Sequence, residues 1–267
     1  MSQLNPIEHN RRAWDRRARE GDRFATPVHK DELSRSRPAI DMDGWLPDNL
    51  HGSRVLCLGA GGGRHGPLYA AAGAKVTVVD VSAQQLEWDR QIAGKYGYDL
   101  HTLDTSMDDL SVLSEEGFDI VVQPVSTCYL PDIRKVYREV ARVTQPGGLY
   151  ISQHKQPMNL QAHVHSSPRG YELIEPYYRT GPLPEVIGSP HREPGTVEYL
   201  HRWDELVGEM CRSGFAIEDL NEPRHADNNA RSGSFDDRSR FIPPYVRLKA
   251  RRIEKFPARE TRRLVLR

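Results

Sequence analysis

Short apolar runs recur along most of the chain, each separated from the next by a longer segment of mixed polarity. Runs of this length, bounded by glycine, proline or acidic residues, are typical of strands buried on both faces of a parallel sheet. The pattern predicts strands at residues 54–58, 75–80, 99–103, 118–122, 149–154, 215–220 and 245–251.

The segments between these runs carry apolar residues at helical spacing. Ile133, Val136 and Tyr137, continued by Val140 and Val143, share one helical face. Capping residues, a proline at a first helical position or a closing glycine mark helix ends elsewhere. The predicted helices begin next to Asn5, His65, Ser82, Pro131 and Trp203.

Strands that alternate with helices through short connections form right-handed crossovers. We therefore predict an α/β protein, a doubly wound and mainly parallel sheet with helices on both faces. Ligands of such sheets bind beyond the carboxyl ends of the strands, where the strand order reverses. Side chains that follow the first five strands are the candidates for chemistry.

Length and composition narrow the class of protein. The chain has 267 residues, of which 37% are hydrophobic, enough for one substantial core in a single domain. No apolar run approaches the roughly 18 residues of a membrane span, and the polar, arginine-rich N-terminus lacks the apolar region of a secretion signal. Three widely spaced cysteines fit neither a disulfide framework nor a zinc site. We expect a cytoplasmic protein that crosses no membrane.

The charge is balanced overall but uneven along the chain. The 37 Lys and Arg residues match the 37 Asp and Glu residues, yet residues 240–267 hold ten basic and two acidic side chains. A basic tail is one way to bind nucleic acid. Because no aromatic-interleaved basic motif accompanies it, we favour a solvated strand edge and do not expect a nucleic-acid partner.

A glycine-rich turn follows the first predicted strand. Residues 59–63 read Gly-Ala-Gly-Gly-Gly, which lets a ligand approach the main chain closely. Two spacings compete: Gly59-x-Gly61-x-Gly63, and Gly61-x-Gly63-x-x-Gly66, which matches the dinucleotide pattern. The second would suit a nicotinamide-dependent oxidoreductase, so the turn alone leaves two classes of cofactor open.

Acidic residues end the next two predicted strands. Asp80 ends the second, where an ionised carboxylate can accept from both hydroxyls of a ribose. Asp104 ends the third and is followed by Thr105 and Met107, which suits an adenine amine beside a thioether that packs on the ring. Each acid is also compatible with a loop aspartate next to a helix start. With the glycine turn, Asp80 favours a nucleoside site.

These pieces, in this order, resemble the class I S-adenosylmethionine-dependent methyltransferases over nearly the whole chain. The resemblance rests on VLCLGAGGG at residues 55–63, VVDVS at 78–82, the Asp104 segment, FDIVVQPV at 118–125 and PGG at 146–148. It implies a Rossmann-like seven-stranded sheet of order 3-2-1-4-5-7-6 with strand seven antiparallel. The N-terminal helix, with NRRAWD at residues 10–15, resembles the lid of some bacterial members.

The resemblance also implies a set of cofactor-binding residues. In it, the glycine turn lines the methionine moiety, Asp80 holds the ribose, and Asp104 with Met107 frames the adenine. Residues after the fourth strand border the donor, and the lid contributes Trp14. The implied set is Trp14, Gly59, Ala60, Gly61, Asp80, Val81, Gln85, Asp104, Thr105, Met107, Gln123, Pro124 and Val125.

One position departs from the family pattern. Many relatives carry an acidic residue two positions before the first glycine of the turn, and this chain has Cys57 there. The acidic group that orients the methionine amine is therefore missing from that position. Cys57 itself is best interpreted as a small buried strand residue.

No catalytic residue can be assigned from the sequence. Methyl transfer from a sulfonium depends mainly on proximity and alignment, so a general base is optional. His154 and Tyr129, at the carboxyl edge of the sheet, are weak candidates, and a structural role is favoured for each. His163 and His165 match no metal-ligand spacing, so no metal is expected.

The sequence therefore predicts one methyltransferase domain over residues 1–267, with S-adenosylmethionine as cofactor and a small molecule as acceptor. Residues 1–24 would form the lid. Residues 156–200, which hold seven of the 19 prolines and several tyrosines, would shape the acceptor site. The alternatives are an NAD(P)-dependent oxidoreductase that uses residues 61–66, and a cofactor- or nucleic-acid-binding module without turnover.

Overall fold

A single seven-stranded sheet forms the centre of the computed structural model, which describes residues 5–22, 26–186 and 191–253. The strand order is β3-β2-β1-β4-β5-β7-β6. β7 runs antiparallel to β5 and β6, whereas the other neighbours pair in parallel. The predicted order and the direction of strand seven are confirmed. The strands are β1 (Arg54–Leu58), β2 (Lys75–Asp80), β3 (Leu100–Asp104), β4 (Phe118–Gln123), β5 (Thr144–Lys155), β6 (Phe215–Asn221) and β7 (Tyr245–Arg252).

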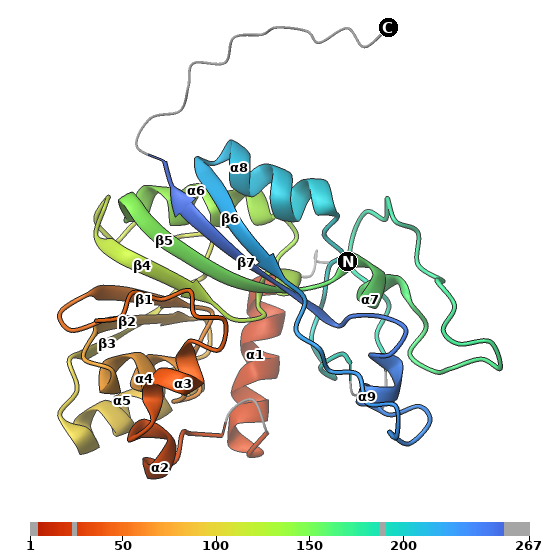
Figure 1. Ribbon diagram of the computed structural model, residues 1–267, viewed down its shortest axis with the longest axis horizontal. Coiled ribbons are helices and arrows are strands. Elements are labelled where there is room, and N and C mark those ends of the chain that lie inside the picture. The colour runs from red at the N-terminus through yellow and green to blue at the C-terminus, as the bar shows by residue number, and fades with distance from the viewer. Residues whose placement is uncertain (1–4, 23–25, 187–190, 254–267) are drawn as a thin grey trace, which may run out of the picture.

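Helices cover both faces of the sheet (Figure 1). One face is covered by α3 (Ser36–Ile40), α4 (His65–Ala71) and α5 (Ala83–Tyr96), and the other by α6 (Ile133–Val143) and α8 (Met210–Arg212). A π-helical turn over Asp204–Glu209 leads into α8. The remaining helices are α1 (Pro6–Arg19), α2 (Lys30–Leu33), α7 (Pro157–Gln161) and α9 (Phe235–Arg238).

The sheet separates two apolar cores because successive side chains of a strand point to opposite faces. From β1, Leu56 and Leu58 enter the core under α6, where Tyr137 is fully buried. Val55 and Cys57 enter the core under α4 and α5. The central strands are thus apolar on both faces, which is why they read as continuous apolar runs.

Helix α1 joins two distant parts of the chain. Asn5 caps it by accepting from the N–H groups of Ile7 and Glu8. Asn10, which is buried, donates to the carbonyl oxygens of Tyr129 and Val197 at 3.0 Å each and accepts from the Val197 N–H at 2.8 Å. The helix therefore bridges the end of β4 and the segment beyond β5.

Some element boundaries differ from the predicted ones. Strand β5 begins at Thr144, so Pro146 and the glycines after it lie within the strand and do not merely end α6. The pairing of β4 with β5 shifts register there: Phe118 faces Thr144, and Ile120 faces Leu149. The short helices α2, α3 and α9 were not predicted, because helices of four or five residues carry no periodic signal.

Residues 156–200 are largely irregular in their described part, which holds helix α7 and two isolated bridges, Ala162 with Leu173 and Ser167 with Gly170. The basic segment 240–267 is described as far as residue 253, where Arg247 pairs with Asp43 and both Lys249 and Arg251 pair with Glu218. The expectation of a strand edge is wrong here, because β7 lies between β5 and β6. Residues 254–267 lie outside the described part. Across the described ranges, no helix has the length and apolarity to cross a membrane.

Candidate active site

A cavity of about 610 Å³ opens at the carboxyl ends of β1, β2 and β4 and extends under α1. Its volume is within the range of small-molecule sites. It brings together most of the residues singled out in the sequence. Those that line it are Trp14, Gly59, Ala60, Gly61, Asp80, Val81, Gln85, Thr105, Met107, Pro124, Val125 and Tyr129.

Asp104, Gln123 and His154 do not line this cavity. The half-exposed Asp104 carboxylate lies beside the rim, 3.5 Å from the Arg11 guanidinium of α1. Asp104 lies opposite Asp80 in the backbone pairing of β2 with β3, at the ends of the two strands. Gln123 is buried beneath the floor, where its Nε2 donates to Met107 Sδ and to Ser126 Oγ at 3.1 and 3.0 Å.

The glycine turn gives the cavity a floor of bare main chain. Gly59 has φ +60°, a conformation that side chains with a Cβ rarely adopt, and a Cβ there would lie 2.8 Å from the side chain of Ser126. A Cβ on Gly61 would lie 2.9 Å from the Gln85 Cβ and 3.1 Å from the Asp80 side chain. Glycine is therefore required at positions 59 and 61, because a Cβ at either would collide with these side chains.

Asp80 sits beside this floor with acceptor capacity to spare. Its Oδ2 accepts from the Gly61 N–H and its Oδ1 from the Ser82 N–H, both at 2.9 Å. Each carboxylate oxygen can accept a further hydrogen bond. Burial raises the pKa of Asp80, and the hydrogen bonds from Ser82 and Gly61 oppose the rise. The arrangement suits a diol such as the ribose of a nucleoside.

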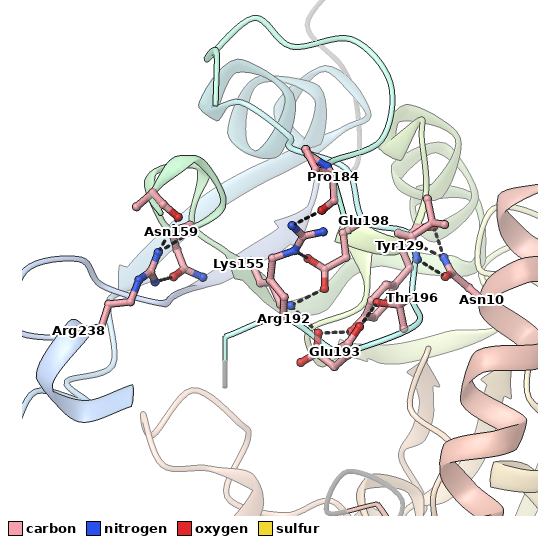
Figure 2. A network of polar contacts seen from close by, with 12 residues as sticks. Asn10, Tyr129, Lys155, Asn159, Pro184, Arg192, Glu193, Thr196, Glu198 and Arg238 are labelled. Atoms are coloured by element: carbon pink, nitrogen blue, oxygen red, sulfur yellow. Dashed lines mark hydrogen bonds and ion pairs between the residues drawn. The ribbon is translucent and has the colours of Figure 1, made fainter. Parts of the chain in front are cut away.

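The far side of the cavity carries a carboxylate that the sequence analysis did not identify. Glu193 lines the cavity, and its Oε2 accepts from the Tyr129 hydroxyl at 2.9 Å and from Lys155 Nζ at 2.6 Å. Lys155 also donates to Glu198 at 2.9 Å, and Arg192 donates to the other oxygen of Glu198 at 2.9 Å (Figure 2). These four charged side chains form a buried, electrically balanced cluster, the Lys155 cluster.

The Lys155 cluster fixes the charge of Glu193. Burial alone would raise the pKa of its carboxyl, but the Lys155 ammonium and hydrogen bonds from neighbours lower that pKa below its usual value. Burial and the adjacent carboxylate instead raise the pKa of Glu198. At neutral pH the cavity therefore presents an ionised Glu193 that is held in place by Lys155 and Tyr129.

The two weak candidates for a general base occupy unfavourable positions for that role. Burial, then the charge of Glu193, raises the pKa of Tyr129 well above its usual value, so its phenol stays protonated as a donor. His154 is fully buried, with its ring nitrogens 2.9 Å from Thr127 Oγ1 and 2.8 Å from Ser152 Oγ. Burial lowers the pKa of His154 to about 3. Its geometry is that of a structural residue within β5.

No signal in the sequence pointed to Glu193, because it lies in the irregular segment where periodicity gives no information. Among the described residues, no group of three or more His, Cys, Asp or Glu side chains is arranged to hold a metal ion. His163 and His165 lie near each other, with ring centroids 5.6 Å apart, outside the cavity.

The fold and this site together define a class of protein. A sheet of order 3-2-1-4-5-7-6 carries a glycine-rich turn after β1, an aspartate with spare acceptor capacity at the end of β2 and the apolar Met107 after β3. These features fit the nucleoside and methionine parts of S-adenosylmethionine. They are those of a class I S-adenosylmethionine-dependent methyltransferase.

Comparisons with known proteins agree. Residues 56–152 match the family described as "Methyltransferase domain". The chain is 38% identical to the uncharacterised methyltransferase YbaJ of Bacillus subtilis over 225 residues, which cover 79% of this chain and 88% of YbaJ. The chain therefore belongs to the class I S-adenosylmethionine-dependent methyltransferases, and S-adenosylmethionine is its cofactor.

Solved structures show the same fold. An S-adenosylmethionine-dependent methyltransferase from Mesorhizobium loti superimposes with a TM-score of 0.65 at 22% identity, covering 81% of this chain and 98% of its own. Geranyl diphosphate C-methyltransferase from Streptomyces coelicolor, solved with Mg²⁺, geranyl diphosphate and S-adenosylhomocysteine, reaches 0.59 at 15% identity. That likeness covers 95% of this chain and 100% of that enzyme.

Proposed function

We propose that this protein transfers the methyl group of S-adenosylmethionine to a small-molecule acceptor. The observation that carries the proposal is the cavity itself, because one enclosure holds both the residues suited to the cofactor and the Trp14, Tyr129 and Glu193 wall opposite them. In this proposal α1 forms the lid and residues 156–200 shape the acceptor side. Structural neighbours that bind small molecules support this substrate class.

On the cofactor side, Asp80 would accept from the ribose hydroxyls and residues 59–61 would lie against the methionine part. Val81, Gln85, Thr105 and Met107 would surround the adenine, with Asp104 at its rim. Trp14, Pro124 and Val125 would border the donor, and the buried Gln123 would act indirectly by holding Met107.

Bound S-adenosylmethionine supplies an electrophilic methyl group on a sulfonium. The chain contributes placement, which for well-oriented reactants is worth up to about 7–11 kcal/mol. The rings of Trp14 and Tyr129 pack edge to face with their centroids 5.5 Å apart. They give the acceptor side of the cavity a rigid aromatic wall. The ionised Glu193 can accept a hydrogen bond from an acceptor hydroxyl or amine and orient its lone pair.

The test is S-adenosylhomocysteine formation with radiolabelled S-adenosylmethionine and a panel of small phenols, aliphatic alcohols and amines. We expect label to appear in at least one organic acceptor, and Glu193→Gln to lower that turnover without weakening cofactor binding. Binding of S-adenosylhomocysteine without turnover of any panel member, but with label in added RNA or protein, would replace the small molecule by a macromolecular acceptor.

Two further expectations belong with this proposal. Cys57, Cys128 and Cys211 are unpaired thiols, which supports a reducing compartment such as the cytoplasm. The described part of the chain contributes no feature that calls for a nucleic-acid partner. A salt-dependent mobility shift with RNA or DNA would count against this view.

A further inference from the structure

Beneath the glycine turn lies a second carboxylate, Asp89 of α5, which does not line the cavity. Asp89 is fully buried, and its Oδ2 accepts hydrogen bonds from the N–H groups of Gly62 at 3.1 Å and Gly63 at 3.0 Å. Its Oδ1 has no hydrogen-bond partner within the described residues. Helix α4 closes over that oxygen at Gly66, where an added Cβ would lie only 3.1 Å from it.

The backbone N–H groups of the turn are all engaged by the protein. Those of Gly59 and Ala60 donate to the Val79 carbonyl oxygen at 2.8 and 3.4 Å, and that of Gly61 donates to Asp80. Asp89 accepts from the next two, and the Gly62 N–H also donates to the Gln85 carbonyl oxygen at 3.2 Å. A dinucleotide-binding turn instead directs such groups at a pyrophosphate.

We propose that Asp89 is the positioning residue of the cofactor turn: an internal carboxylate that accepts from the N–H groups of Gly62 and Gly63 and thereby commits the turn to a nucleoside without phosphate. A pyrophosphate at the turn would find these donors taken and a negative charge directly behind them. A phosphate-free nucleoside needs only the floor at residues 59–61, where Asp80 accepts from the Gly61 N–H and Asp89 holds the two residues that follow.

The proposal also accounts for Cys57. Burial, and after it the nearby Asp89 charge, raises the pKa of the Cys57 thiol well above its usual value. An acidic residue at position 57 would place a second buried carboxylate beside Asp89, and like charges in such a site repel strongly. The neutral thiol leaves Asp89 as the carboxylate beneath the turn, supplied by α5 in place of β1.

Asp89 makes the turn sensitive to pH. Burial raises the pKa of its carboxyl to about 7, with Asp80 adding to the rise and with Gly63, Gly62 and Arg90 opposing it. The groups around it are Cys57 on β1, Asp80 on β2, Arg90 on α5 itself and Gly66 on α4. As pH falls through about 7, Asp89 gains a proton and its grip on the two N–H groups weakens.

The test is calorimetric titration of S-adenosylhomocysteine into the wild type, Asp89→Asn, Asp89→Ala and the control Glu87→Gln, an exposed acid of the same helix. At pH 8 we expect Asp89→Ala to weaken binding about tenfold or more, and Glu87→Gln to leave it unchanged. Wild-type affinity should fall several-fold from pH 8 to pH 6. Asp89→Asn should remove most of that fall, because the amide cannot titrate.

A second readout needs no ligand. Amide hydrogen exchange at Gly62 and Gly63 should accelerate in Asp89→Ala relative to Glu87→Gln. If the alanine variant does not fold, the near-isosteric Asp89→Asn carries the pH comparison alone.

Three results would overturn the proposal: unchanged affinity in Asp89→Ala, identical pH profiles for the wild type and Asp89→Asn, or wild-type binding of NADH as tight as that of S-adenosylhomocysteine. None of these measurements involves the methyl acceptor. The first two results would leave the proposed function untouched, whereas tight binding of NADH would also count in favour of the oxidoreductase alternative.

Discussion

Three buried or partly buried carboxylates around one cavity are held in different states by their neighbours. Asp80 shares its oxygens with two backbone N–H groups and keeps capacity for a ligand. Asp89 accepts hydrogen bonds from the N–H groups of the turn, and the adjacent Lys155 keeps Glu193 ionised. Burial raises the pKa of a carboxyl group, whereas an adjacent cation lowers it. The same type of group can therefore serve three different roles at this site.

A fourth buried group gives a prediction for stability against pH. His154 stays neutral in the fold because burial lowers its pKa to about 3, whereas an unfolded histidine titrates near 6.5. Below pH 6.5 the unfolded chain binds a proton that the folded chain does not, so the stability contributed by His154 is lost as pH falls. We expect the advantage of the wild type over His154→Asn in urea unfolding to shrink by roughly 1.4 kcal/mol per pH unit between pH 6 and 4.

A constant gap for His154→Asn would show that this histidine becomes charged without cost to the fold.

For single residues, the sequence predicts functional side chains well where they directly follow an apolar strand. The turn at residues 59–63 and Asp80 are recognisable because the strands before them are unmistakably apolar. Asp89 escaped prediction because it stands mid-helix among polar neighbours, although it is fully buried. Its role depends on α5 lying across the turn, which local pattern does not encode.

At the scale of helices and strands, capping residues mark where an element begins and ends. Helix α5 begins at the Ser82 cap, whose hydroxyl accepts from the Gln85 N–H, and ends at Gly97 with φ +68°. Strand β5 is the exception, because it begins at Thr144 and continues through a proline-glycine sequence that normally ends regular structure. Thr144 pairs with β4 before this sequence, and Leu149 pairs with both β4 and β7 after it, so pairing on either side overrides the local preference.

Two glycine substitutions in α5 test the effect of glycine inside a helix and at its end. Gly94 lies exposed within α5, with nothing within 4 Å of an added Cβ, so Gly94→Ala should raise the free energy of unfolding by roughly 0.5–1 kcal/mol. Gly97→Ala should lower it by about 1 kcal/mol, because alanine is strained at positive φ. Chemical denaturation measures both, and a shift of the same sign in the two variants would contradict this account of the helix end.

Across the whole molecule, the functional cavity depends on segments far apart in the sequence. Asn10 of α1 bonds to Val197, and Lys155 at the end of β5 bonds to Glu193 and Glu198. The predicted topology brought the strand ends together correctly. It did not predict the position of residues 156–200, because side-chain contacts between a loop and a sheet produce no periodic pattern in the sequence.

The Lys155 cluster should therefore matter for global stability. Lys155→Met leaves two buried carboxylates without their shared cation, and breaking a buried pair in this way costs about 3–5 kcal/mol. Lys135→Met, at an exposed position of α6, should change stability by less than about 0.5 kcal/mol. Equal unfolding midpoints for the two variants would show that the cluster does not hold the segment to the sheet.

The central claim is that a phosphate-free nucleoside binds at the glycine turn with its ribose on Asp80. It is tested most directly by titrating S-adenosylhomocysteine into the wild type and Asp80→Ala, with Asp99→Ala as an exposed control. We predict that Asp80→Ala loses roughly 1.5–3 kcal/mol for each charged hydrogen bond removed, while Asp99→Ala binds like the wild type. Equal affinity in all three proteins would contradict the account.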